Sequence, residues 1–182
     1  MREKFRELVK KRNRIYANLE LLHWDLETKT PVKSKPYLSD LVAELSMKEY
    51  DLFTSDEFVN LVEALNKEKE NLSEIEKKEI ELSMEGIERM KKIPADEYED
   101  YAKLTSINQG IWEEAKSKKD FSIVKTNLEK IFNYSKKFAE YRRKDEKNLY
   151  DVLLNDYEKG MDTEKLDIFF SELKKEIVPF LK

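Results

Sequence analysis

The scarcity of glycine and proline is the sequence feature that most limits the possible folds. The 182 residues include only three glycines and four prolines. A β-sheet protein of this length needs many more turn residues, whereas long helices joined by short loops do not. From Phe5 to Leu26 the apolar residues recur at every third or fourth position, which is the spacing of an amphipathic helix. The sequence therefore predicts an all-α chain of about seven to eight helices, arranged as an antiparallel bundle or as hairpins with short loops.

Local start signals place the second, third and fourth helices. Pro36 suits the first turn of a helix, because the missing proline N–H would have no partner there. Thr54 with Glu57, and Ser73 with Glu76, have the spacing of a capping box, in which each member satisfies a backbone N–H near the other. We therefore expect a helix to begin at each of these three points.

The remaining helices follow from proline and from further capping residues. A helix is expected over 95–118, directly after Pro94, and a short one over 150–154. Asp162 or Thr163 suits the N-cap of the last helix. The spacing of the apolar residues on that helix predicts a face turned toward the core, made of Leu166, Phe169, Phe170, Leu173 and Ile177.

Composition excludes several classes of protein. With no cysteine, the chain has no disulfide, no thiolate metal site and no cysteine nucleophile. The 35 basic and 39 acidic residues are interspersed, so no basic face for nucleic acid is expected. No window is apolar enough to span a membrane, and the charged N-terminus does not resemble a signal peptide. We expect a cytoplasmic protein, and the many Lys and Glu residues are typical of thermophiles.

The domain organisation is predicted to be simple. We expect one helical domain over 1–182, with a possible subdomain junction near 67–74, where the sequence is densely charged. The last residues, 177–181, are mostly apolar, whereas chain ends are usually polar. We therefore expect a face that a longer polypeptide would cover, and a homodimer when it is not covered.

The residues that could carry catalysis are few. His23 is the only histidine, so the sequence has no HExxH zinc motif and no second Glu-x-x-His motif for a di-metal bundle. It has neither a GxSxG elbow nor a glycine-rich phosphate loop. We predict no catalytic residue and no metal ligand in this chain. His23 is interpreted as a helix residue hydrogen-bonded near a packed interface.

One face of the helix over 95–118 is unusually polar. Hydroxyl and amide groups in the middle of a buried face must find hydrogen-bond partners or line a groove. Two interpretations remain open: a polar network between helices, or one wall of a ligand cleft. At helical spacing the face consists of Tyr98, Tyr101, Ala102, Thr105, Asn108, Gln109, Trp112 and Ala115.

Three separated blocks of sequence resemble one protein family. The first is LLHWDLET (residues 21–28), followed by Pro31. The second joins Ile93 and Pro94 to YAKLTS (101–106) and WEEA (112–115). The third is YDVLLNDYEKGM (150–161). In this order the blocks resemble the N-terminal region of the Taq-type thermostable zinc metallocarboxypeptidases.

The resemblance implies a function that these residues alone do not show. The family removes C-terminal amino acids from peptides with zinc, and its HExxH part lies downstream of every block matched here, so no zinc ligand carries over. The implied partners are therefore that catalytic part of the same enzyme and, in the complete enzyme only, a peptide substrate. The chain would form part of the cleft wall without being catalytic itself. The alternative is a stand-alone, non-catalytic helical interaction module derived from that family.

The family motifs also give a set of residues with expected structural roles. Trp24 is expected to be a buried anchor, and Asp25 or Glu27 to hydrogen-bond the turn that follows. Gly160 is expected to allow a left-handed or tightly turned backbone before the last helix. The full set is His23, Trp24, Asp25, Glu27, Tyr98, Thr105, Trp112, Tyr150, Asp151, Asp156, Tyr157 and Gly160.

Overall fold

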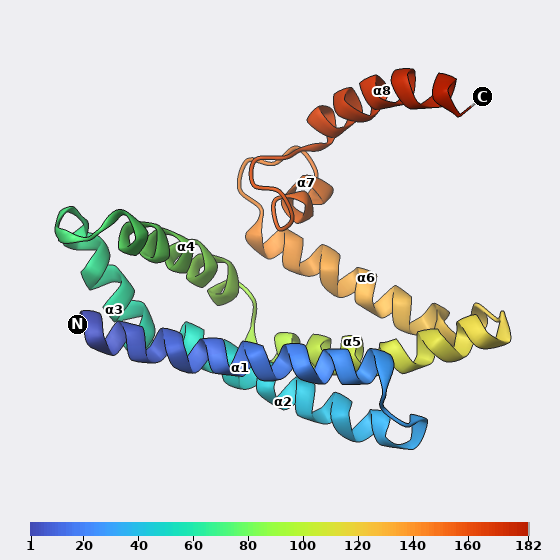
Figure 1. Ribbon diagram of the computed structural model, residues 1–182, viewed down its shortest axis with the longest axis horizontal. Coiled ribbons are helices and arrows are strands. Elements are labelled where there is room, and N and C mark those ends of the chain that lie inside the picture. The colour runs from blue at the N-terminus through green and yellow to red at the C-terminus, as the bar shows by residue number, and fades with distance from the viewer. Residues whose placement is uncertain (182) are drawn as a thin grey trace. The chain divides into compact units, whose positions relative to one another are not determined.

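The computed structural model describes residues 1–181, and these residues form helices without any strand (Figure 1). The predicted all-α class and number of helices are confirmed. The α-helices are α1 (Arg2–Thr28), α2 (Lys35–Thr54), α3 (Asp56–Lys67), α4 (Glu74–Lys91), α5 (Ala95–Lys118), α6 (Ser122–Arg142), α7 (Leu149–Leu154) and α8 (Thr163–Phe180), with short 3-10 helices η1 (Val32–Ser34) and η2 (Lys69–Asn71). Among the described residues, no helix is both long and apolar enough to cross a membrane.

Most of the predicted helix starts are confirmed, and one is wrong. Ser73 and Glu76 form the complete capping box of α4, and Pro36 lies in the first turn of α2. The N-cap of α3 is Ser55, whose hydroxyl accepts from the N–H of Phe58. Thr54, the predicted cap, is instead the last residue of α2, and its hydroxyl donates to the Tyr50 carbonyl. Two adjacent hydroxyl residues both fit the start of a helix, and the sequence pattern does not choose between them.

The chain divides into two compact units, unit 1 (Met1–Tyr134) and unit 2 (Ser135–Lys182). The charged segment at 67–74 therefore lies inside unit 1. In unit 1, α1 and α2 form an antiparallel hairpin, α2 also packs on α5, and α3 packs on α4 (Figure 1). The most deeply buried side chains come from α2, α3 and α4: Phe53, Phe58, Val62 and Ile80.

A close approach of two helices shapes this core. A methyl group added at Gly86 of α4 would lie 2.7 Å from the ring of Phe53 on α2. The Arg12 guanidinium lies 3.6 Å from the centroid of that ring and forms an ion pair with the buried Glu49 at 2.6 Å. The ion pair satisfies a carboxylate that would be costly to bury alone.

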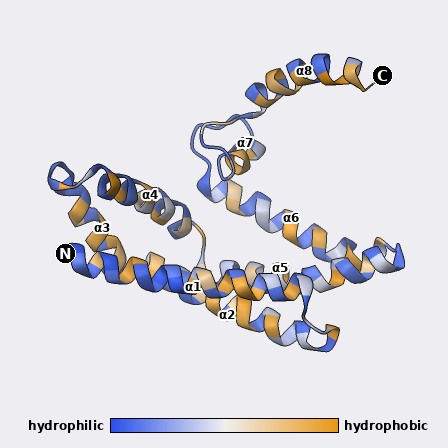
Figure 2. Cartoon of the chain, in the orientation of Figure 1, coloured by the Kyte–Doolittle hydropathy of each residue, from blue (hydrophilic) through white to orange (hydrophobic). Residues whose placement is uncertain are grey.

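Among the residues of unit 2 that the structure describes, the buried ones lie at the end of α6 and in α7. The buried side chains there are Phe138, Ala139, Asp151 and Val152. Asp162 caps α8 as predicted, by accepting from the N–H of Lys165. The predicted inward face of α8 is wrong for the described residues, because this helix buries none of its side chains. Figure 2 shows that α8 carries both hydrophobic and hydrophilic residues. Spacing shows which residues share a face, but it does not show what covers that face.

Candidate functional site

A pocket of about 310 Å³ lies within unit 1, between α1, α2 and α5. It brings together two blocks that are about 70 residues apart in the chain. The packing of α1 and α5 against α2 creates this meeting point. The pocket is lined by His23, Leu26 and Glu27 from α1, by Val42 and Ser46 from α2, and by Tyr98, Tyr101, Ala102, Thr105, Ser106 and Gln109 from α5.

Tyr98 is held in the pocket wall by an aromatic contact. Its ring stacks on Tyr50 with 4.9 Å between the centroids, and the Tyr50 hydroxyl donates to the Ile93 carbonyl at 2.7 Å. Burial, reinforced by the nearby Glu49 carboxylate, raises the pKa of Tyr98 to about 12. The Tyr98 hydroxyl is therefore protonated at neutral pH and can donate a hydrogen bond.

The polar groups of the pocket differ in whether they have partners. The Thr105 hydroxyl donates to the carbonyls of Tyr101 and Ala102 in its own helix, at 2.9 and 3.1 Å. Gln109 Nε2 reaches the Glu113 carboxylate at 3.4 Å, a long contact. These bonds lie within α5, but Glu113 also pairs with Lys35 of α2, and the Ser39 hydroxyl of α2 donates to the Ser106 carbonyl. The polar face of α5 therefore both bonds to α2 and lines the pocket.

Ser106 stands out among the pocket residues. It is only 7% exposed, and its hydroxyl has no hydrogen-bond partner within residues 1–181. A buried hydroxyl without a partner costs roughly 1–3 kcal/mol, so most such groups are satisfied in folded proteins. Sequence analysis missed this residue because only the packed structure shows that its hydroxyl is both buried and unpaired.

In the first motif block (residues 21–28), Trp24 and His23 do not have the roles that the sequence predicted. Trp24 is 63% exposed and is not a buried anchor. The inward stripe of α1 contains Leu19, Leu22 and Leu26, and Trp24 lies about 200° around the helix from its neighbours on that stripe. His23 is also exposed and, within the described residues, has no hydrogen bond. The interpretation of His23 as a bonded interface residue is therefore wrong.

The turn after α1 is closed by the backbone. The carbonyl of Asp25 accepts from the N–H groups of Lys29 and Thr30, and the Thr28 hydroxyl donates to the Trp24 carbonyl. Neither the Asp25 nor the Glu27 carboxylate bonds this turn, so that prediction is wrong. Trp112, the other motif tryptophan of unit 1, is 43% exposed and lies outside the pocket lining.

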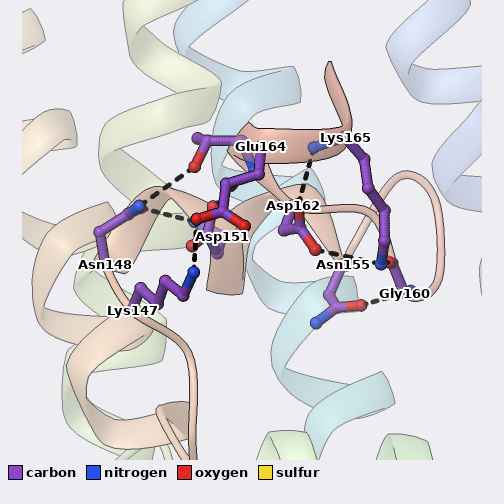
Figure 3. A network of polar contacts seen from close by, with 9 residues as sticks. Lys147, Asn148, Asp151, Asn155, Gly160, Asp162, Glu164 and Lys165 are labelled. Atoms are coloured by element: carbon purple, nitrogen blue, oxygen red, sulfur yellow. Dashed lines mark hydrogen bonds and ion pairs between the residues drawn. The ribbon is translucent and has the colours of Figure 1, made fainter. Parts of the chain in front are cut away.

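The third block forms a polar network within unit 2 (Figure 3). The buried Asp151 accepts from the N–H of Thr163 at 2.8 Å, so its carboxylate holds the start of α8 beside α7. Asn148 caps α7 by accepting from the N–H of Asp151. Asn155 accepts from the N–H of Gly160, whose φ of +80° confirms the predicted left-handed backbone.

The remaining motif residues of unit 2 have contrasting positions. Asp156 forms a two-oxygen ion pair with Arg142 of α6, with both N–O distances at 2.8 Å. Tyr150 and Tyr157 are 59% and 89% exposed. The network therefore builds the turns between α6 and α8, and the two tyrosines lie on its surface. Arg142 and Asn148 complete it, although the motif match did not single them out.

The residues of the described chain do not suit a catalytic metal. Within 1–181 no group of three or more His, Asp or Glu side chains is arranged to hold a metal ion. A catalytic zinc site needs three protein ligands and one open position. No zinc-dependent step can therefore be assigned to these residues.

The sequence profile of the carboxypeptidase Taq (M32) metallopeptidases matches residues 4–182. The chain belongs to this family. It is 35% identical over 180 residues to Carboxypeptidase 1 of Bacillus subtilis (strain 168), covering 99% of this chain and 36% of that protein. Against Thermostable carboxypeptidase 1 of Pyrococcus furiosus it is 35% identical over 182 residues, covering 98% of this chain and 36% of that protein.

The fold agrees with that of a solved structure. The crystal structure of BsuCP matches 97% of this chain with a TM-score of 0.92 at 35% identity, and the match covers 35% of that chain. The chain thus spans about a third of the length of the curated relatives that it matches.

Proposed function

We propose that this chain is the N-terminal helical part of a zinc metallocarboxypeptidase, which removes C-terminal amino acids from peptides. In this role the chain supplies part of the substrate-cleft wall and no catalytic group, and its partner is the catalytic part of the same enzyme. The observation that carries the proposal is the match of nearly the whole chain to about a third of two carboxypeptidases. The pocket formed by the first two motif blocks is the stretch of wall that we assign to this chain.

A chimera tests the proposal directly. The matched third of B. subtilis Carboxypeptidase 1 is replaced by residues 1–182, and release of the C-terminal residue is measured on an N-blocked dipeptide. We expect the chimera to be active and the isolated chain to be inactive and free of stoichiometric zinc. Deletion of the matched third and a C-terminally amidated dipeptide are the controls. A folded but inactive chimera, or zinc-dependent turnover by the isolated chain, would refute the proposal.

The exposed face of α8 supports a second candidate, a non-catalytic interaction module that forms a homodimer. Phe169, Phe170, Ile177 and Phe180 are between 43% and 89% exposed. Large apolar patches on single chains usually mark contacts with a partner. Light scattering over a concentration series tests this: we expect a dimer that Phe170→Asp dissociates, whereas a monomer at all concentrations would contradict it.

The proposal also covers the cellular location of the protein and the growth temperature of its organism. A cytoplasmic location agrees with the absence of cysteine, and a thermophilic source agrees with the surface ion pairs on α2, α4 and α5, such as Lys48 with Glu44 and Lys103 with Glu99. Fractionation of the source organism and the melting temperature of the chain test these points.

A further inference from the structure

From the chemistry of the pocket between α1, α2 and α5, we infer that it binds an organic cation, the ammonium or guanidinium group of a peptide. The inference rests on the proposed function only in naming a peptide as the carrier of the charge. The cation-binding chemistry itself follows from the side chains that line the pocket.

The charged side chains in the pocket lining indicate the charge of the ligand. Glu27 is the only acidic residue among the described lining residues, and none of them is a lysine or an arginine. Its carboxylate forms no ion pair within residues 1–181. A carboxylate that faces a concave site without a cation of its own favours a positively charged ligand.

The aromatic residues of the lining also favour a positively charged ligand. Tyr98 and Tyr101 lie one helical turn apart on α5, and both line the pocket. A ring face attracts a cation and offers an anion nothing comparable. The Tyr98 ring is fixed by its stack on Tyr50, so a ligand would meet a preorganised wall.

Ser106 supplies an independent sign that a hydrogen-bond partner is missing from the pocket. Its hydroxyl is buried and unpaired, and a hydroxyl oxygen can accept from an N–H group. The Gln109 side-chain oxygen adds a second acceptor, because the contact of Gln109 with Glu113 uses only its nitrogen. Ammonium and guanidinium groups carry several N–H donors and no acceptor, which matches this set.

His23 makes the test simple, because the only histidine of the chain lines the pocket. Its ring protons are followed by NMR while the full chain is titrated with acetyl-arginine amide, acetyl-citrulline amide or alanyl-alanine amide. Citrulline has nearly the shape of arginine without its charge, and the dipeptide carries only an α-ammonium. We expect saturable chemical-shift changes of His23 with acetyl-arginine amide or with alanyl-alanine amide. Acetyl-citrulline amide should bind about tenfold more weakly.

Matched variants separate the pocket from general charge effects. Glu27→Gln is expected to weaken arginine binding about fivefold, whereas Asp25→Asn removes the same charge outside the lining and should leave the affinity unchanged. Ser106→Ala should weaken binding without lowering the free energy of unfolding of the free chain, since its hydroxyl has no partner to lose. The inference is overturned by the absence of saturable shifts, by equal affinity for citrulline, or by equal losses in the two charge variants. Because the titration needs no peptidase activity, its result is independent of the chimera assay.

Discussion

Unit 1 and unit 2 differ in how many apolar side chains they bury. In unit 1 most of the buried residues are apolar and they come from six helices, and the one buried carboxylate, Glu49, is paired with Arg12. In unit 2 a buried carboxylate, Asp151, lies beside a few apolar residues, and hydrogen bonds from loop backbone define the turns. The comparison shows that apolar burial fixes how long helices pack, whereas a short connection between helices depends on particular polar residues.

The largest expected effect lies in the core of unit 1. Phe53 is 1% exposed and packs against Phe58 and Gly86. Phe53→Ala should lower the free energy of opening of unit 1 by about 3–5 kcal/mol, because it leaves a cavity. Hydrogen exchange of the α2 and α3 amides measures the loss. Tyr37→Ala on the exposed side of α2 is the control and should have little effect.

The second prediction tests whether polar contacts stabilise unit 2. Asp151→Ala leaves the N–H of Thr163 without its acceptor. We expect the free energy of opening at residues 150–163 to fall by roughly 1–3 kcal/mol. Asp167→Ala removes an exposed carboxylate from α8 and serves as the control. Equal, small effects of the two substitutions would mean that the network in Figure 3 does not stabilise unit 2.

The sequence predicted the parts of both units that depend on local chemistry. The capping box at Ser73, the bounds of α5 and the positive φ at Gly160 follow from neighbouring residues, and each is confirmed. The pocket could be predicted only as one of two interpretations of the polar face of α5. Its other wall, with His23 and Glu27, is about 70 residues away in the chain and meets α5 only through packing on α2.

A smaller effect concerns the start of α8 in acid. Hydrogen bonds from the Lys165 N–H and ammonium group lower the pKa of Asp162 below its ordinary value of 3.8. A lowered pKa in the folded chain means that the stabilisation is present above the unfolded value and is lost as pH falls through the folded value.

Asp162→Asn provides the matched comparison, because asparagine caps a helix without titrating. We expect the helical carbon chemical shifts of residues 163–166 to decline between pH 4 and pH 2 in the original chain, and to change less in the variant. The same acid response in both proteins would show that another group controls the start of α8.

The smallest effect is expected at the residue that sequence reasoning placed wrongly. Trp24→Ala should change the free energy of unfolding of the isolated chain by less than about 0.5 kcal/mol, because the side chain is 63% exposed. Leu26→Ala, two residues along the same helix but 3% exposed, should cost about 2–5 kcal/mol. A loss of several kcal/mol at Trp24, measured by urea titration, would mean that the side chain is buried after all.

Leu21, one turn before Trp24, is also exposed, so the two form an apolar patch on α1. If the catalytic part covers this patch, Trp24→Ala should destabilise the chimera more than it destabilises the isolated chain.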